Sequence, residues 1–299
     1  MIQRVRIKNF RCLRDVELEL SPLTLLVGPN ASGKSSILKA LGSLTLSSSD
    51  RWQHSASPGL ELQLAGGNHY SAGEKEWNRK RPYEARLLHL DVQKLRASNQ
   101  VERQHRLADD GSNLVNVFAS LTRKEKERLA QELAARVPVI SDVDHRPEAQ
   151  VGWHRLVFQD RWAPSVWYEP QEISDGTILM LAFLLLQYEQ PPVDLLAVEE
   201  PERGLHPYLL GELLSFMREL STGEIGSRPI QILLATHSAE LLEFARPEEV
   251  RFLTRRGEDI VVEKAPIDSP DWKASLREYR ESLGSVWLSG GLGGVPGGH

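Results

Sequence analysis

A glycine-rich segment near the start of the chain has the spacing of a phosphate-binding loop. Residues 28–35 read GPNASGKS, which matches G-x-x-x-x-G-K-[ST], between a strand-like apolar run (23–27) and a helix-like run (36–41). Backbone N–H groups of such a loop surround phosphates at the positive end of the following helix. Lys34 is expected to reach the β and γ phosphates of ATP and Ser35 to ligate Mg²⁺. The residues predicted to contact the nucleotide here are Gly28, Pro29, Asn30, Ala31, Ser32, Gly33, Lys34, Ser35 and Ser36.

Two adjacent carboxylates follow a second apolar run. Glu199 and Glu200 directly follow the segment LLAV, 195–198. That apolar run is typical of an interior parallel strand. An ATP-hydrolysing P-loop protein needs acids there, so Glu199 is predicted to serve the metal and Glu200 to polarise the attacking water as general base. The alternative is a solvated strand end with two surface acids.

A third strand-like run, 230–235, ends in Thr236-His237-Ser238. Ligands of open α/β sheets collect at the carboxyl ends of the strands, so His237 is expected at the same edge as the acids. We assign it a catalytic role as a sensor of the γ phosphate. A lone histidine at a strand end is more often structural, and this interpretation therefore depends on the other motifs.

The elements that must position these residues follow an α/β pattern. Alternating apolar residues around Val5 and Val16 predict two half-buried N-terminal strands, and 250–254 and 260–263 predict two more near the end. Segment 43–82 is rich in Ser, Gly, His and Trp and suits a long loop or irregular hairpins. Residues 87–90 predict another strand, after which the chain is hydrophilic and helical through about residue 140, with a capping box at Thr122 and Glu125.

Composition excludes several classes of protein. The 299 residues include 40% hydrophobic and 26% charged residues, which is ordinary for a soluble globular chain. A net charge of -5 gives no overall attraction to nucleic acid. Cys12 is the only cysteine, which suits a reducing compartment, and the longest apolar run, 178–186, is too short for a membrane span. A cytoplasmic protein without a membrane association is expected.

Several motifs in order resemble one family. The segments GPNASGKSS, ISDGT, LLAVEEPERGLHP and ATHSAELL, with the opening IKNFRCLRDVELELSPLTLLVG and DGSNL at 110–114, resemble AAA-family ATPases of ABC type. This group includes the chromosome-maintenance heads and the overcoming-lysogenization-defect proteins. The resemblance spans residues 1 to about 265. It implies an α/β P-loop head, with a central mostly parallel sheet and N-terminal antiparallel strands, and an inserted mainly helical lobe.

The resemblance also implies a composite site in a homodimer or larger homo-oligomer. ISDGT, 173–177, takes the place of the transporter signature LSGGQ, so Ser174, Asp175 and Gly176 would contact the nucleotide held by another copy. A helix start carrying Ser and Gly suits an anion. A literal LSGG at 288–291 is rejected because it lies about ninety residues after the glutamates.

Departures from the family pattern limit what the resemblance implies. Arg203 stands where similar proteins often have a small polar residue. Gln93 is the best candidate for the glutamine loop, although a surface glutamine is as plausible an interpretation. Arg11 could approach the nucleotide or be a surface charge.

The predicted domains are a discontinuous ATPase head (1–95 and 166–265), an inserted lobe leading up to the signature segment (96–165) and a glycine-rich tail (266–299). No acidic cluster after residue 240 resembles the TOPRIM nuclease that follows the ATPase in overcoming-lysogenization-defect proteins. The leading hypothesis is therefore an ATP-driven switch in phage defence or nucleic-acid maintenance that gates a separately encoded, nuclease-like effector.

Other functions stay open at this point. A small-molecule kinase would also carry a P-loop but needs neither Glu200 nor ISDGT. A transporter subunit would carry LSGGQ before its acids and pair with a membrane protein. An ATP-stabilised scaffold with negligible hydrolysis fits as well. Basic stretches at 79–81 and 123–126 could contact nucleic acid, but solvated charged faces are commoner.

Overall fold

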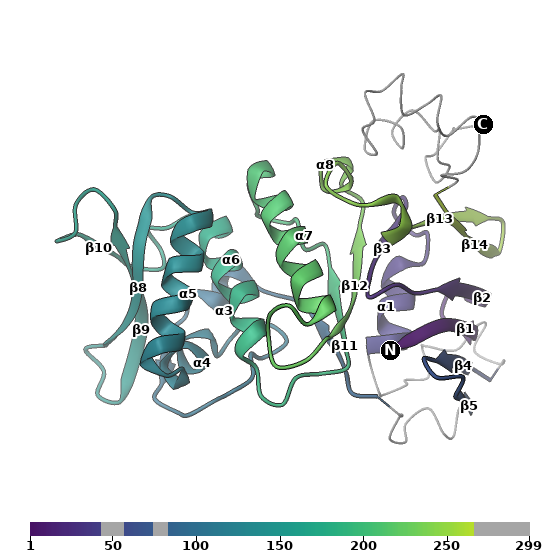
Figure 1. The fold of residues 1–299 in the computed structure, drawn as a ribbon, viewed down its shortest axis with the longest axis horizontal. Helices are drawn as coiled ribbons and strands as arrows, with labels where there is room; N and C mark the ends of the chain where they lie inside the picture. The colour runs from purple at the N-terminus through teal and green to yellow at the C-terminus, as the bar shows by residue number, and fades with distance from the viewer. Residues whose placement is uncertain (43–56, 74–82, 266–299) are drawn as a thin grey trace. The chain divides into compact units, whose positions relative to one another are not determined.

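A computed structural model describes residues 1–42, 57–73 and 83–265, and these fall into two compact units (Figure 1). Unit 1 consists of 1–87, 193–202 and the chain from 230 onward, and unit 2 of 88–192 and 203–229. The sequence-predicted lobe boundaries at 96 and 165 both fall inside unit 2, and the functional division based on them stays a prediction.

The candidate site lies on the main sheet of unit 1. Its strands are β3 (Leu23–Val27), β6 (Ala85–Leu88), β11 (Leu195–Glu199), β12 (Gln231–Thr236), β13 (Val250–Arg256) and β14 (Asp259–Lys264). Their order among the described residues is β14-β13-β3-β12-β11-β6. Strand β12 pairs in parallel with both β3 and β11, so Val27 lies opposite Thr236 and Ala235 opposite Glu199. Because the strands run the same way, the three segments that follow them start at one edge.

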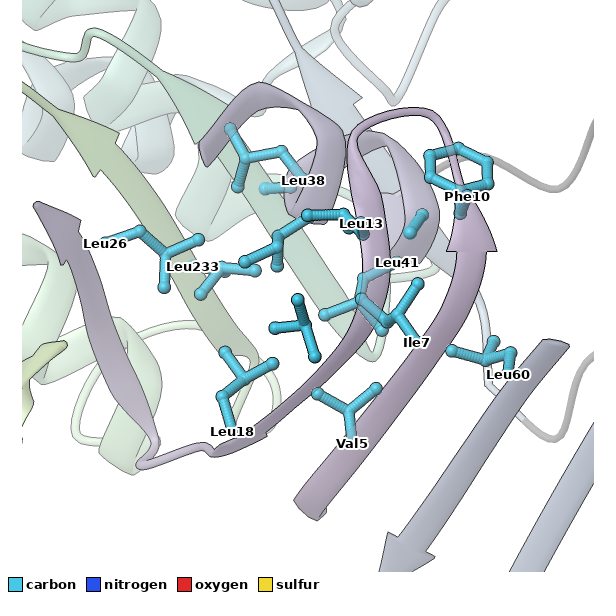
Figure 2. Close-up of a cluster of buried hydrophobic side chains, with 14 of the residues drawn as sticks. Val5, Ile7, Phe10, Leu13, Leu18, Leu26, Leu38, Leu41, Leu60 and Leu233 are labelled. Carbon is cyan, nitrogen blue, oxygen red and sulfur yellow. The ribbon is translucent and has the colours of Figure 1, made fainter. Parts of the chain in front are cut away.

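A second, antiparallel sheet in unit 1 has the order β2-β1-β4-β5. It consists of β1 (Ile2–Phe10), β2 (Leu13–Glu19), β4 (Gly59–Leu64) and β5 (His69–Gly73). Helix α1 (Lys34–Gly42) contacts β1 as well as β11 and β12. Leu38 and Leu41 of α1 point into one core with Val5 and Leu60 from this sheet and Leu233 from the main sheet (Figure 2). Burying these side chains fixes α1, and with it the loop that precedes it.

Unit 2 combines helices with an antiparallel sheet. The helices are α3 (Val92–Leu95), α4 (Leu114–Ser120), α5 (Arg123–Arg136), α6 (Asp175–Leu185) and α7 (Pro207–Thr222), with the 3-10 turn η3 (Leu186–Tyr188) after α6. The strands are β7 (Asn99–Gln100), β8 (Ile140–Pro147), β9 (Trp153–Asp160) and β10 (Trp167–Tyr168). Figure 1 shows α5 against β8, and α6 contacts the four other helices. Those contacts explain why α6 is apolar on nearly every side.

The predicted α/β fold is confirmed, with parallel strands around the loop and antiparallel N-terminal strands. The predicted capping box is also present, because Thr122 and Glu125 close the start of α5. The hairpin β8–β9 is an addition that sequence analysis did not anticipate. The turn η4 (Pro247–Glu249) and the short helix α8 (Ala239–Leu242) complete the described elements of unit 1. Within the described residues, no helix is both long and apolar enough to cross a bilayer.

Candidate functional site

The loop between β3 and α1 has the backbone of an anion cradle. Ala31 and Gly33 both have left-handed conformations, with φ of 64° and 96°, and Ser32 lies between them. Alternation of this kind turns successive N–H groups toward one side of the chain. The first turn of α1, KSSI, carries no acidic side chain of its own, and an acid there would oppose the binding of an anion at the positive end of the helix. Ala31 is not glycine, so its left-handed conformation costs about 1 kcal/mol or more. Backbone strain of this kind is common in functional loops.

Lys34 lies inside this loop. Its side chain is buried, and Nζ donates hydrogen bonds of 2.7 Å to Gly28 O and 2.9 Å to Pro29 O. Burial lowers the pKa of Lys34, while Glu200, Glu199 and Glu202 raise it in part. The ammonium group is thus fixed among backbone carbonyls next to the cradle, where it can face a phosphate.

The predicted metal residues lie together. Ser35 Oγ donates a short hydrogen bond to Glu199 Oε1, which joins the start of α1 to the end of β11. A hydroxyl and a carboxylate are oxygen ligands of the kind that Mg²⁺ prefers, and Mg²⁺ usually takes only one or two protein ligands beside phosphates and waters. The oxygen atoms of Ser35 and Glu199 therefore fit Mg²⁺. Within the described residues, no group of three or more His, Cys, Asp or Glu side chains is placed to hold a metal ion.

Glu200 and His237 form a second pair at the same edge. The Glu200 N–H donates to Ala235 O at 2.8 Å, and the chain then turns with a left-handed φ of 47° at Glu200. The turn aims the carboxylate at His237, whose Nδ1 lies 3.2 Å from Glu200 Oε1. The predicted base and the predicted sensor are thus in contact.

Glu202 is a member of this edge to which sequence analysis gave no role. Its Oε1 accepts a 2.6 Å hydrogen bond from the fully buried Thr236 Oγ1, which in turn accepts from the Ser238 N–H at 2.9 Å. Its Oε2 is buried and makes no hydrogen bond to the described residues. Burial raises the pKa of Glu202, and the hydrogen bond from Thr236 opposes the shift. Its place two residues after Glu200 is the signal that could have identified it.

A pocket of about 150 Å³ joins the loop to the two glutamates. This volume matches phosphate groups and a cation better than a whole nucleotide. Its lining residues are Cys12, Asn30, Ala31, Ser32, Gly33, Lys34, Ser35, Ser36, Glu199, Glu200 and Ala235. Cys12 Sγ lies 3.3 Å from Ser36 Oγ.

The predicted signature residues all belong to unit 2. Ser174 is the exposed N-cap of α6, and its Oγ accepts from the Thr177 N–H at 3.2 Å. Asp175 pairs with Arg96 at 2.5 Å. A side chain at Gly176 would lie 3.3 Å from Gly204 O, so glycine permits the start of α6 to pack against the segment after the glutamates.

Other residues considered in the sequence have defined places. Gln93 is exposed on α3, Arg203 is exposed in unit 2, and Arg11 has a φ of 50° in the turn between β1 and β2. DGSNL is a structural loop, in which Asn113 Oδ1 accepts from the Ala108 N–H at 2.6 Å. The basic stretch 79–81, the rejected LSGG at 288–291 and the predicted tail lie outside the described residues.

Comparisons with known proteins match two parts of the chain to ATPase families. Residues 1–105 match the family described as "AAA ATPase domain", and residues 123–243 match "AAA domain, putative AbiEii toxin, Type IV TA system". The two matches contain the phosphate loop and both glutamates. The chain is therefore similar to AAA-family ATPase domains, a group that includes those of OLD and SMC proteins.

Relatives by sequence and by structure support that statement. A 41-residue stretch is 56% identical to OLD nuclease from Thermus scotoductus, and it spans 14% of this chain and 8% of that protein. The SMC head domain from Thermotoga maritima aligns with a TM-score of 0.53 at 15% identity, over 88% of this chain and 98% of that one. An SMC head bound to the C-terminal winged-helix domain of ScpA aligns with 0.59 at 15% identity, over 89% and 98%. A head with an extended coiled coil from Pyrococcus furiosus, bound to the C-terminal domain of ScpA, aligns with 0.58 at 12% identity, over 93% and 99%.

Proposed function

We propose that this chain binds and hydrolyses ATP with Mg²⁺ and that two copies close around two nucleotides. The observation that carries the proposal is the meeting of Lys34, Ser35–Glu199 and Glu200–His237 at one sheet edge. Phosphoryl transfer to water needs a fixed cation facing the phosphates, oxygen ligands for a metal and a group that orients water. The described residues of this edge include all three.

The roles follow from position. Backbone N–H groups of the loop and the Lys34 ammonium would bind the β and γ phosphates. Ser35 and Glu199 would hold Mg²⁺, which neutralises phosphate charge when bound. Glu200 would accept a hydrogen bond from the attacking water, and His237, 3.2 Å from Glu200, would contact the γ phosphate.

Dimer formation would complete the site. In this proposal the exposed Ser174 hydroxyl and the N-terminus of α6 receive the γ phosphate bound by another copy. ATP then stabilises the closed dimer because these contacts exist only in that state.

A variant that binds ATP without hydrolysing it tests the proposal. Glu200→Gln should slow turnover by about 10²–10⁴-fold while retaining ATP, since an amide is a poor general base. Light scattering with ATP and Mg²⁺ should show a doubled mass for this variant. The matched control Lys34→Ala/Glu200→Gln should stay at the lower mass, because loss of the buried ammonium weakens ATP binding by roughly 100-fold. A Glu200→Gln protein whose mass and conformation do not respond to ATP contradicts the dimer switch and leaves the scaffold alternative.

We further propose that a separate, nuclease-like effector reads the closed state in phage defence or nucleic-acid maintenance. The similarity to OLD nuclease and the ScpA domains bound to two of the SMC heads support a protein partner. A switch acts only if another surface distinguishes its two states. Affinity purification from the native host, with the full chain and with a chain ending at Leu283, tests the idea. Recovery of homo-oligomers alone, with and without ATP, would exclude a stable effector complex.

A further inference from the structure

Arg96 holds the segment that precedes α6. Its guanidinium Nη1 donates to Gln171 O at 3.3 Å, and Nη2 donates to Ile173 O at 3.0 Å and pairs with Asp175 Oδ1 at 2.5 Å. The Arg96 side chain is only 14% exposed. One planar group therefore fixes two backbone carbonyls and the first carboxylate of α6, an arrangement that a lysine could not reproduce.

The backbone around Arg96, at the end of α3, is itself held in place. Arg96 is the C-cap of α3, and Asp91 caps the other end by accepting from the Gln93 N–H at 2.8 Å. Leu95 is fully buried, and a Cβ on Gly111 of the DGSNL loop would come within 2.4 Å of it. The Asp91 N–H also donates to the carbonyl of Asp110 at 3.0 Å. DGSNL thus anchors α3, and α3 presents the guanidinium.

Electrostatics add a second effect. Asp175 lies in the first turn of α6, next to Ser174, where a carboxylate would repel an approaching phosphate. The guanidinium at 2.5 Å offsets that charge and leaves the helix N-terminus attractive to an anion. Arg96 also fixes the carbonyls of Gln171 and Ile173, which precede the exposed Ser174.

We infer that Arg96 is the positioning residue for the signature segment and thereby for the ATP-dependent dimer. This inference rests on the proposed function. It assigns Arg96 no contact with the nucleotide of its own subunit. Loss of Arg96 should therefore spare ATP binding and impair the pairing of two subunits.

The first test uses the non-hydrolysing background. Arg96→Ala in Glu200→Gln should bind ATP with unchanged affinity by calorimetry, yet dimerise at least about 30-fold more weakly by light scattering. Arg96→Lys keeps the charge but not the planar guanidinium, so its dimerisation should be intermediate in strength. It replaces the alanine variant in this test if that variant does not fold. The control is Lys94→Ala on the same helix, which loses only an exposed ion pair with Asp110 and should dimerise normally.

The second test separates positioning in the partner from general damage. Lys34→Ala and Arg96→Ala subunits are each expected to be inactive as homodimers. In a mixed dimer, ATP bound by the Arg96→Ala subunit would face the intact signature segment of the Lys34→Ala subunit. ATPase activity of the mixture should therefore rise clearly above that of either variant alone.

The outcomes are distinguishable. If Glu200→Gln fails to dimerise with ATP, the proposed function fails. If it dimerises and adding Arg96→Ala changes nothing, only the role of Arg96 is overturned. A mixture without recovered activity, from variants that fold and where Arg96→Ala still binds ATP, would also overturn it.

Discussion

Thr236 Oγ1 donates a 2.6 Å hydrogen bond to Glu202 Oε1, and this bond joins the segment after β11 to the last residue of β12. The same oxygen of Thr236 accepts from the Ser238 N–H, so the backbone on both sides of His237 is fixed. Glu200 lies in the segment after β11, and His237 directly follows Thr236. We therefore expect the Thr236–Glu202 bond to support the 3.2 Å contact between Glu200 and His237.

Removing that bond should impair hydrolysis more than binding. Thr236→Val keeps the shape of the side chain but lacks the hydroxyl, and we expect kcat to fall about 10-fold with little change in KM, because a hydrogen bond to a carboxylate is lost. Thr236→Ser retains the hydroxyl and is the matched control. Steady-state ATPase assays measure both. Equal kcat in the two variants would show that the bond does not matter for turnover.

Glu202 should also make stability depend on pH. Burial raises its pKa in the folded state above the ordinary 4.5, so the folded protein holds its proton to higher pH than the unfolded chain. Its contribution to the free energy of unfolding therefore falls as pH rises from about 4.5 through the raised pKa. Glu202→Gln does not titrate. Its melting temperature relative to wild type should increase between pH 5 and pH 8, and a pH-independent difference would contradict the shift.

How much of the site the sequence predicts depends on how far apart along the chain the interacting residues lie. The runs LLAV and 230–235 are continuous apolar segments between polar residues, so β11 and β12 were predicted to within about a residue, and parallel pairing then brings Glu199 and His237 to one edge. The role of Glu202 depends on Thr236, which lies 34 residues later. Periodicity carries no information about such a contact.

The hairpin of unit 2 was missed for a local reason. Strand β8, ISDVDHRP, has a register shift between Ile140 and Asp142, so its buried residues do not alternate regularly. Alternation is the main signal of a half-buried strand. The link from Arg96 to Asp175 spans 79 residues and was likewise invisible before the fold was known.

Gly28 should tolerate no side chain. A Cβ there would lie 2.4 Å from Leu253 O and 2.7 Å from Ser32 Oγ, and the carbonyl belongs to β13, which cannot easily move. Gly28→Ala should therefore distort the phosphate loop, weaken ATP binding at least about 10-fold and destabilise the fold by about 1–3 kcal/mol. Gly59→Ala is the control, because among the described residues its Cβ would approach only Lys8 Cβ, at 3.8 Å. Calorimetry and thermal melting compare them, and equal behaviour would argue against a close fit at Gly28.

Alanine variants of Ser174 and Thr122 distinguish a role in helix capping from a role in dimerisation. Each caps its helix by accepting from an N–H three residues on, so Ser174→Ala and Thr122→Ala should each cost about 1 kcal/mol of stability. In the Glu200→Gln background, Ser174→Ala should lose the ATP-dependent increase in mass, whereas Thr122→Ala should keep it. If both variants dimerise normally, the signature assignment of Ser174 is wrong.

The left-handed turn at Glu200 implies that activity and stability oppose each other at this position. A glutamate held at a φ of 47° is strained by about 1–2 kcal/mol, and asparagine adopts this conformation more readily. Glu200→Asn should therefore raise the melting temperature while ending hydrolysis. Selection for stability alone should favour replacement of Glu200, whereas selection for turnover should favour Glu200. A library of variants at position 200, sorted once for stability and once for ATPase activity, should therefore yield different residues in the two sorts.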